Sequence, residues 1–249
     1  VTGAAGQVGQ SIVNNALKCN AKIACLDLSL ENLEDAARKN SWTKNVNLYK
    51  VDITKERSIS KIFTKILNDF GKIDSLVNNA GISVFDPWYN RTEDDFNKVL
   101  NVNLKGTFLC IKEFLKYLTK SGCEGSIVNI ASHYGIISPD PRIYTDCDRR
   151  NSEVYGASKA GIIHMTKYFS VNALADGANV RINSVAPGGI LNEENPQGED
   201  FQRLYSERCP MQRMAFVDEM AGPILFLISP DASYVNGHTI VVDGGMSSW

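Results

Sequence analysis

Tyr155 and Lys159 stand four residues apart in "EVYGASKAG", residues 153–161. On a helix this spacing places both side chains on one face, one turn apart. A free phenol has a pKa of about 10, too high for a base at neutral pH, and a neighbouring ammonium group favours the phenolate. Tyr155 would then act as a base or acid that exchanges a proton with a bound oxygen. Chance alone readily produces one such pair, so a catalytic role also requires a cofactor site and polar partners elsewhere in the sequence.

Three glycines near the start of the chain, Gly3, Gly6 and Gly9, have a spacing suited to a turn that holds a dinucleotide. We expect a helix to begin near Gln7, and the N–H groups and dipole of a helix N-terminus attract a pyrophosphate. Glycine lets the phosphates approach the backbone and lets the helix pack on the preceding strand. A plain strand-to-helix turn is the alternative, because a glycine pattern by itself is a weak signal.

Asp27 strengthens the interpretation of the glycine turn. It ends the second predicted strand, where a carboxylate can bind both hydroxyls of an adenosine ribose. Alternatively, Asp27 contributes to the cap of the next helix, which begins at Ser29, and the two roles are compatible. A carboxylate repels a 2'-phosphate, and neither "AAGQV" nor "DLSLE" supplies an Arg or Lys to receive one. The sequence therefore predicts NAD as the cofactor in preference to NADP.

Composition and charge exclude several classes of protein. The 249 residues are 43% hydrophobic, enough to bury a large core, and the length favours one domain over residues 1–249. A formal charge of -2 argues against nucleic acid or an anionic membrane as a partner. No apolar run approaches the roughly 18 residues of a membrane span, and the opening residues lack the basic start of a signal peptide, so we expect a soluble, cytoplasmic protein. The 6 Cys include no CxxC and the 3 His lie far apart, which predicts neither disulfides nor a metal site.

The pattern along the chain alternates between short apolar runs and helical stretches. Strands that are apolar throughout and alternate with helices form a parallel sheet covered on both faces. We therefore expect a single-domain, doubly wound α/β Rossmann fold with about seven parallel strands. Only Val1 and Thr2 precede the glycine turn, so we expect the first strand to be truncated. The others are expected in "KIACLDL", "VNLYKVD", "IDSLVNNAG", "GSIVNIAS", "VRINSVAPG" and "HTIVVDGG".

The order and spacing of eight motifs resemble those of the short-chain dehydrogenases/reductases. Besides the glycine turn, the motifs are "VDIT" (51–54), "NNAG" (78–81), "NVNLKGTF" (101–108), "IVNIAS" (127–132), "YGASKAG" (155–161), "RINSVAPGG" (181–189) and "VVDGG" (241–245). The resemblance runs nearly end to end. It implies a nicotinamide cofactor and a homodimer or homotetramer built through long central helices.

The resemblance also implies a role for each matching residue. The catalytic set would be Asn103, Ser132, Tyr155 and Lys159. Asp52 and Ile53 would flank the adenine, and Pro187 and Gly188 would border the nicotinamide. Together, the residues implied to contact the cofactor are Gly3, Gly6, Gln7, Val8, Gly9, Asp27, Asp52, Ile53, Asn78, Asn79, Ala80, Gly81, Tyr155, Lys159, Pro187, Gly188 and Ile190.

Ser132 and Asn103 also have chemistry of their own. Ser132 follows a predicted strand at its carboxyl end, the edge where open α/β sheets bind ligands, and its hydroxyl can hydrogen-bond a reacting oxygen. A loop-capping serine is the alternative. Asn103 lies on the apolar stripe of a predicted helix, so its amide must find partners. It is either a satisfied core residue or the group that holds a water for proton relay.

Three features depart from the usual pattern of the family. Gln7 stands where many members have glycine, which leaves the G-x-x-G-x-x-G spacing found in the sugar-nucleotide branch. Asn192 stands where a Thr commonly contacts the cofactor, which puts that contact in doubt. Ser132 and Tyr155 are 23 residues apart, farther than is usual, and we expect the extra segment, residues 133–154, to arch over the pocket. With "APGGILNEENPQ", this segment is similar to the flagellin-modification type of short-chain dehydrogenase found in nonulosonic-acid pathways.

The sequence therefore predicts hydride transfer between NAD and a secondary alcohol or ketone, on a sugar phosphate or nucleotide-linked sugar. Two alternatives stay open: a sugar dehydratase or epimerase with retained NAD, and a catalytically inactive NAD-sensing binding protein, against which the intact catalytic set argues. Arg142 lies between Pro141 and an apolar pair, and we expect it to face the pocket and bind an anionic group. The alternative is that Arg142 pairs with nearby acidic residues on the surface. His133, next to Ser132, is a second expected substrate contact.

Overall fold

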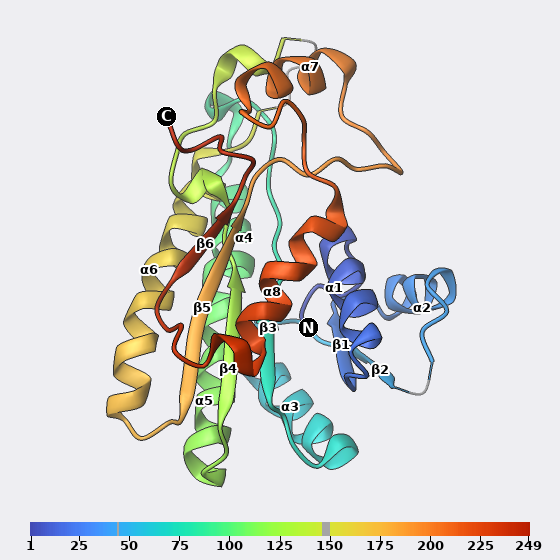
Figure 1. Ribbon diagram of the computed structural model, residues 1–249, viewed down its shortest axis with the longest axis vertical. Coiled ribbons are helices and arrows are strands. Elements are labelled where there is room, and N and C mark those ends of the chain that lie inside the picture. Colours follow the sequence, from blue (N-terminus) through green and yellow to red (C-terminus); the bar gives the residue numbers. More distant parts are fainter. Residues whose placement is uncertain (44, 146–149) are drawn as a thin grey trace.

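The computed structural model describes residues 1–43, 45–145 and 150–249. Strands and helices alternate along the chain, as the apolar pattern predicts (Figure 1). The strands are β1 (Ile23–Asp27), β2 (Val46–Lys50), β3 (Ser75–Asn78), β4 (Gly125–Ile130), β5 (Val180–Pro187) and β6 (Thr239–Val242). The helices are α1 (Gln7–Lys18), α2 (Leu30–Lys39), α3 (Glu56–Phe70), α4 (Glu93–Leu100), α5 (Thr107–Ser121), α6 (Glu153–Ala175), α7 (Glu199–Arg208) and α8 (Ala221–Ile228). Within the described ranges, no helix combines the length and the apolar character needed to cross a membrane.

The strands pair in parallel and form two hydrogen-bonded groups. β1 pairs with β2, and the others pair in the order β3-β4-β5-β6. Val1 and Thr2 lie between the groups, because Thr2 bridges Leu26 of β1 and donates its N–H to the carbonyl oxygen of Val77 in β3 at 3.0 Å. The described residues thus form six strands instead of about seven, since two residues are too few to form a strand in the central position. The chain still reverses its direction of winding at that position, as a doubly wound sheet does.

Neighbouring residues of the central strands face opposite sides of the sheet, which gives the protein two apolar cores. Leu76 of β3 and Ile127 of β4 pack in one cluster with residues of α3, α5 and α6. Val77 and Val128, the next residues along the same strands, pack instead with residues of α1 and α8. Helices therefore cover both faces of the sheet (Figure 1). β4 is buried along its whole length, which accounts for its apolar sequence.

One helical path runs through α4, the stretch Asn101–Gly106 and α5. The middle stretch is π-helical, and Asn103 lies fully buried within it. π-bulges interrupt the regular hydrogen bonding of a helix and occur frequently at functional sites. The apolar stripe in the sequence predicts a continuous helix here and does not reveal the bulge.

The strands bring their carboxyl ends to one edge of the sheet. β1 ends at Asp27, β3 at Asn78, β4 at Ile130 and β5 at Pro187. Beyond this edge, α7 packs against a turn of 3-10 helix, Pro141–Ile143, which belongs to the extra segment (Figure 1). The expected cover over the pocket is therefore present in part, and residues 146–149 of the segment lie outside the described residues. Open α/β sheets bind ligands at this edge.

Candidate active site

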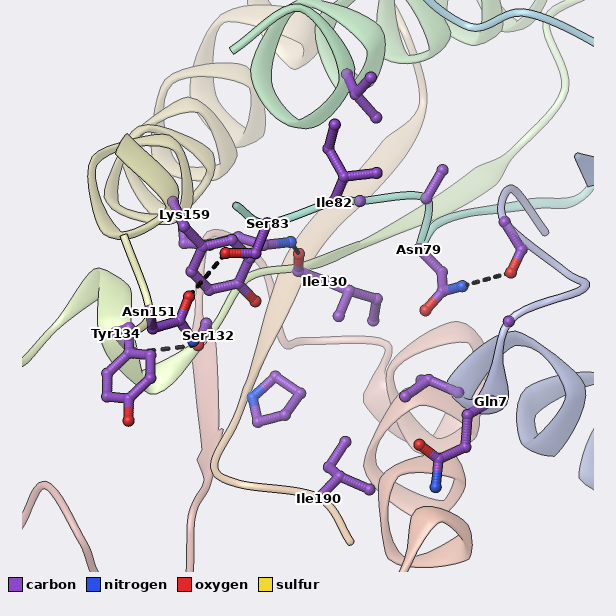
Figure 2. A pocket seen from close by; sticks show the side chains of 18 of the residues that line it. Gln7, Asn79, Ile82, Ser83, Ile130, Ser132, Tyr134, Asn151, Lys159 and Ile190 are labelled. Atoms are coloured by element: carbon purple, nitrogen blue, oxygen red, sulfur yellow. Dashed lines mark hydrogen bonds between the residues drawn. The ribbon is translucent and has the colours of Figure 1, made fainter. Parts of the chain in front are cut away.

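A cavity of about 650 Å³ opens at the carboxyl edge of the sheet (Figure 2). Its lining joins the glycine turn to the ends of the strands and to α6 and α7. It includes Ser132 and His133, but not Asn103, Gly9 or Asn78. The predicted cofactor residues that do line it are Gly3, Gly6, Gln7, Val8, Asp27, Asp52, Ile53, Asn79, Ala80, Gly81, Tyr155, Lys159, Pro187, Gly188 and Ile190.

The glycine turn forms one end of the cavity. Gly3 has a φ of +61°, and a Cβ there would lie 2.7 Å from the Cα of Ala80, so the turn accepts no other residue without a shift. A Cβ on Gly9 would overlap the carbonyl oxygen of Gly3, which shows that Gly9 lets α1 pack against the turn. At Gly6, the N-cap of α1, a Cβ would meet only the Gly3 oxygen, at 3.5 Å. The space beside Gly6 is therefore open to a phosphate at the N-terminus of α1.

Asp27 borders the cavity next to the glycine turn. Its two carboxylate oxygens accept the N–H groups of Ala5, at 3.2 Å, and Ser29, at 3.3 Å. The cap of α2 is Ser29 itself, whose hydroxyl oxygen accepts the N–H of Asn32. The backbone thus fixes the carboxylate, and because Asp27 lines the cavity its remaining lone pairs are available to the hydroxyls of a ribose.

The residues after β3 attach the turn to the sheet. The Asn79 amide donates to the carbonyl oxygen of Gly3 at 3.0 Å (Figure 2). The Ala80 N–H donates to the Thr2 hydroxyl at 3.1 Å. Asn78 differs from the expectation, because it is buried and donates to Asn129 at 2.8 Å instead of lining the groove. Asn78 is the last residue of β3, and its bond to Asn129 of the neighbouring strand β4 holds its side chain within the sheet.

Ser132, Tyr155 and Lys159 meet at the other end of the cavity. Ser132 follows β4, its hydroxyl oxygen accepts the Tyr134 N–H at 3.1 Å, and it lies close enough to the Tyr155 phenol to lower the pKa of that group. The Lys159 ammonium donates to the carbonyl oxygen of Ile130 at 2.7 Å and lies 5.6 Å from the centre of the Tyr155 ring. Tyr155 and Lys159 therefore lie on one helix and line the same cavity, as their spacing predicts. Figure 2 shows Lys159 at Ile130, the end of β4.

Burial shifts the proton affinities of both groups. It raises the pKa of Tyr155 above its usual value of 10, although the hydrogen bond from Ser132 opposes the change. Burial also lowers the pKa of Lys159 to about 8. The expected lowering by the ammonium group is not what this structure shows, because the Lys159 ammonium bonds to Ile130 instead of the phenol. The phenol of Tyr155 is thus protonated at neutral pH and suited to donate a proton.

Asn103 lies behind this site. Its Oδ1 accepts the Ile82 N–H at 2.8 Å, and its Nδ2 donates to the Ile82 carbonyl oxygen at 2.9 Å and to the Ser158 hydroxyl at 3.0 Å. The side chain is a satisfied core amide that fixes the backbone after β3, which matches the first of the two alternatives. Its role in a proton relay stays a prediction.

His133 connects the ends of two strands. A carbonyl oxygen only accepts hydrogen bonds, so the contact of 3.1 Å between Nδ1 and the Pro187 oxygen places the ring proton on Nδ1. Burial lowers the pKa of His133 to about 4, so the ring is neutral near pH 7. The ring lines the cavity, and its bond joins the segment just after β4 to Pro187, the last residue of β5.

The structure contradicts the expectation for Arg142. Its side chain is 83% exposed, pairs with Asp140 at 2.7 Å and does not line the cavity. Asp140 caps the Pro141–Ile143 turn and also pairs with Arg208, so the guanidinium finds a carboxylate two residues away instead of facing the pocket. Asn192 is also turned away from the cavity, since its side chain accepts N–H groups within its own loop.

Besides Ser132 and Tyr155, the cavity is lined by further residues, most of which the sequence did not indicate as site residues. They come from the segment after β3, the extra segment and α7, and their only signal was the number of aromatic side chains in those stretches. Of the described residues around the cavity, Lys159 is the one lysine or arginine. These further lining residues are Ser83, Phe85, Tyr134, Tyr144, Asn151, Gln197, Phe201, Tyr205 and Met214.

Comparison with known proteins gives matches over nearly the whole chain. Residues 3–247 match the family described as Enoyl-(Acyl carrier protein) reductase. The chain is 36% identical to the 3-oxoacyl-[acyl-carrier-protein] reductase FabG of Thermotoga maritima, covering 99% of this chain and 96% of that protein. It is 32% identical to the NADH-dependent L-xylulose reductase of Ambrosiozyma monospora, covering 100% of this chain and 94% of that protein.

Solved structures agree with these sequence matches. A short chain dehydrogenase from Leptospira borgpetersenii with bound NAD+ has a TM-score of 0.86 and 35% identity, covering 99% of this chain and 91% of that chain. ElxO with bound NADP has a TM-score of 0.83 and 31% identity, covering 97% and 95%. The open space beside Gly6 and the fixed carboxylate of Asp27 fit a dinucleotide at the same edge of the sheet. The chain therefore belongs to the short-chain dehydrogenase/reductase family, whose members are oxidoreductases that act on CH–OH groups or ketones with a nicotinamide cofactor.

Proposed function

We propose that the protein, as one domain over residues 1–249, transfers a hydride between NAD and a secondary alcohol or its ketone. The observation that carries the proposal is the meeting of Ser132, Tyr155 and Lys159 at one end of a cavity whose other end is the glycine turn and Asp27. The nicotinamide ring, when bound, supplies or accepts the hydride.

Tyr155 is the proposed proton donor and acceptor. Ser132 and Tyr155 line the same end of the cavity and influence each other's hydroxyls, so a substrate oxygen placed between them receives two hydrogen bonds. Because burial keeps the phenol protonated, Tyr155 donates its proton to the oxygen of a ketone and takes it back in the reverse direction. Lys159 bonds to the carbonyl oxygen of Ile130 with its ammonium 5.6 Å from the ring centre, so it holds the end of β4 beside Tyr155.

Asp27 supports NAD over NADP. A carboxylate held by two backbone N–H groups accepts the hydroxyls of an adenosine ribose but repels a 2'-phosphate. Lysine or arginine is the usual receptor for that phosphate, and the described lining offers only Lys159, which bonds to Ile130 at the opposite end. Similar structures hold NAD+ in one case and NADP in the other, so this choice depends on Asp27.

We propose an uncharged, hydroxylated substrate in place of the sugar phosphate that the sequence predicts. Arg142 was the expected phosphate ligand and is turned to solvent. The substrate end offers aromatic faces with hydroxyl and amide groups between them, such as Phe201, Tyr134 and Asn151, which suit polyols and hydroxy ketones. Relatives named for L-xylulose and glycerol act on molecules of this kind, whereas FabG is named for an acyl-carrier-protein substrate.

A substrate panel tests this proposal. The purified protein is given NAD with polyols, sugars and sugar phosphates, and NADH with the matching ketones, while the absorbance of reduced nicotinamide is followed. We expect turnover with uncharged members, a loss of about 100-fold or more in kcat for Tyr155→Phe, and NAD affinity within a few-fold of wild type. Tyr234→Phe, at an exposed tyrosine that does not line the cavity, is the control.

Each other result of the panel has a separate meaning. A sugar converted without net NADH would favour a dehydratase or epimerase with retained NAD. Preference for a sugar phosphate would overturn the uncharged substrate class. Tyr155→Phe with activity within tenfold of wild type would remove Tyr155 from the chemistry. NAD binding without conversion of any panel member would favour the inactive binding protein.

We further propose a homodimer or homotetramer. The helices α5 and α6 expose large apolar side chains: Phe108, Tyr168, Val171 and Leu174. Apolar side chains gathered on two adjacent helices are typical of a protein interface. Light scattering of the purified protein measures the mass directly, and a monomer at micromolar concentration would contradict this proposal.

A further inference from the structure

Asn151 presents an amide to the cavity with its donor side unoccupied. Its Oδ1 accepts the Ser83 hydroxyl at 2.8 Å, and Nδ2 has no hydrogen-bond partner among the described residues. Asn151 lines the same cavity as Ser132 and Tyr155, and Figure 2 shows its amide oxygen at the Ser83 hydroxyl. An amide nitrogen carries two N–H donors, so these are available to a molecule in the cavity.

The position of Asn151 is tied to the turn of α6 that carries Tyr155. Asn151 directly precedes Ser152, the N-cap of α6, whose hydroxyl oxygen accepts the Tyr155 N–H at 3.2 Å. The next residue, Glu153, pairs with Arg91 at 3.2 Å, and the Arg91 side chain is only 6% exposed. The start of α6 is therefore held from outside the helix as well as by its own cap.

The segment that carries Ser83 is equally fixed. Ile82 is held through both its N–H and its carbonyl oxygen by the Asn103 amide. The carbonyl oxygen of Phe85 accepts the Arg150 N–H at 2.8 Å, and Arg91 donates to the carbonyl oxygen of Asp86 at 2.8 Å. Ser83 lies between these anchored residues, so its hydroxyl holds the Asn151 amide in one orientation.

We propose that Asn151 binds a second oxygen of the substrate, close to the carbon that reacts, and thereby selects hydroxy ketones and polyols over simple ketones and alcohols. The inference rests on the proposed function, because it requires the reacting oxygen to lie at Ser132 and Tyr155. A donor that is already oriented loses little entropy on binding, and a site built to hydrogen-bond a substrate group rejects analogues that lack it. Ser83 and Asn103 act through Asn151 as positioning residues.

The test compares ketones that differ by one hydroxyl beside the carbonyl: acetoin with butanone, and hydroxyacetone with acetone, each with NADH. We expect wild type to prefer the hydroxy ketone by about tenfold or more in kcat/KM. Asn151→Asp keeps the bond from Ser83 but replaces the donor by an oxygen, and Asn151→Leu removes the amide without adding charge. Both are expected to lower kcat/KM for acetoin about tenfold more than for butanone.

Controls separate this role from general damage to the site. Asn90→Asp makes the same change of charge at an exposed asparagine of the neighbouring turn, outside the described lining, and is expected to keep the wild-type preference. Ser83→Ala is expected to reduce the preference mainly through KM, and Ser83→Thr, which keeps a hydroxyl, to restore it.

Equal losses for both ketones, or an unchanged preference in the two Asn151 variants, would overturn the inference. If wild type reduces other ketones of the panel but neither acetoin nor hydroxyacetone, the inference fails and the proposed function stands. If the Tyr155→Phe variant keeps the wild-type rates, the proposed function itself is wrong.

Discussion

Lys159→Met is expected to stabilise the fold while it abolishes turnover. Lys159 is 3% exposed, and burial lowers its pKa from 10.5 to about 8. Below pH 10.5 the unfolded chain binds this proton more strongly than the folded chain, so protonation favours unfolding. The difference between the two pKa values corresponds to about 3 kcal/mol at any pH below 8. Loss of the hydrogen bond to Ile130 offsets about 1 kcal/mol, which leaves a net gain of about 2 kcal/mol.

Urea unfolding of wild type and Lys159→Met near pH 7 and near pH 10 measures this effect. The advantage of the variant should be largest near pH 7 and should shrink as the pH rises from about 8 towards 10.5, because wild type loses its buried charge there. Lys167→Met, at an exposed lysine farther along α6, is the control and is expected to change stability by less than about 0.5 kcal/mol. A variant less stable than wild type near pH 7, or an advantage that does not shrink, would refute the reasoning.

Three further predictions concern the cofactor end and the strand ends. Asp27→Ser should weaken NAD binding by about 1.5 to 3 kcal/mol and raise the relative use of NADP; an unchanged ratio of kcat/KM values would mean that Asp27 only supports the glycine turn. Gly6→Ala should fold normally and bind NAD poorly, whereas Gly9→Ala should lower the melting temperature, because only the second Cβ overlaps backbone. The unfolded chain protonates His133 below about pH 6.5 and the folded chain only below about 4, so wild type should lose up to about 3 kcal/mol of stability as the pH falls through this window. His133→Gln should show a flatter dependence in urea unfolding, and an unchanged slope would contradict the buried neutral ring.

The sequence by itself determined the order of the elements and the cofactor end of the cavity. Apolar strands that alternate with helices form a parallel sheet, and parallel strands bring their carboxyl ends to one edge whatever the loops do. Asp27 and Ser132 reach the cavity because each lies at or just beyond the end of such a strand, and Gly3 because it follows Thr2, which bridges β1. Tyr155 and Lys159 reach it because they share a helix face. These features depend on residues near one another in the chain, so a local pattern contains them.

Only the tertiary structure decided the substrate end. Arg142 has the chemistry of a phosphate ligand, but the capping carboxylate of Asp140 lies closer to it than the cavity does. Ser83 and Asn151 are ordinary residue types 68 positions apart, and nothing in either segment indicates that they meet. Burial, which sets the pKa of Tyr155, also depends on how distant segments close over the site. The physical reason is that side-chain direction in loops follows from contacts between segments, and no local period of the sequence encodes those contacts.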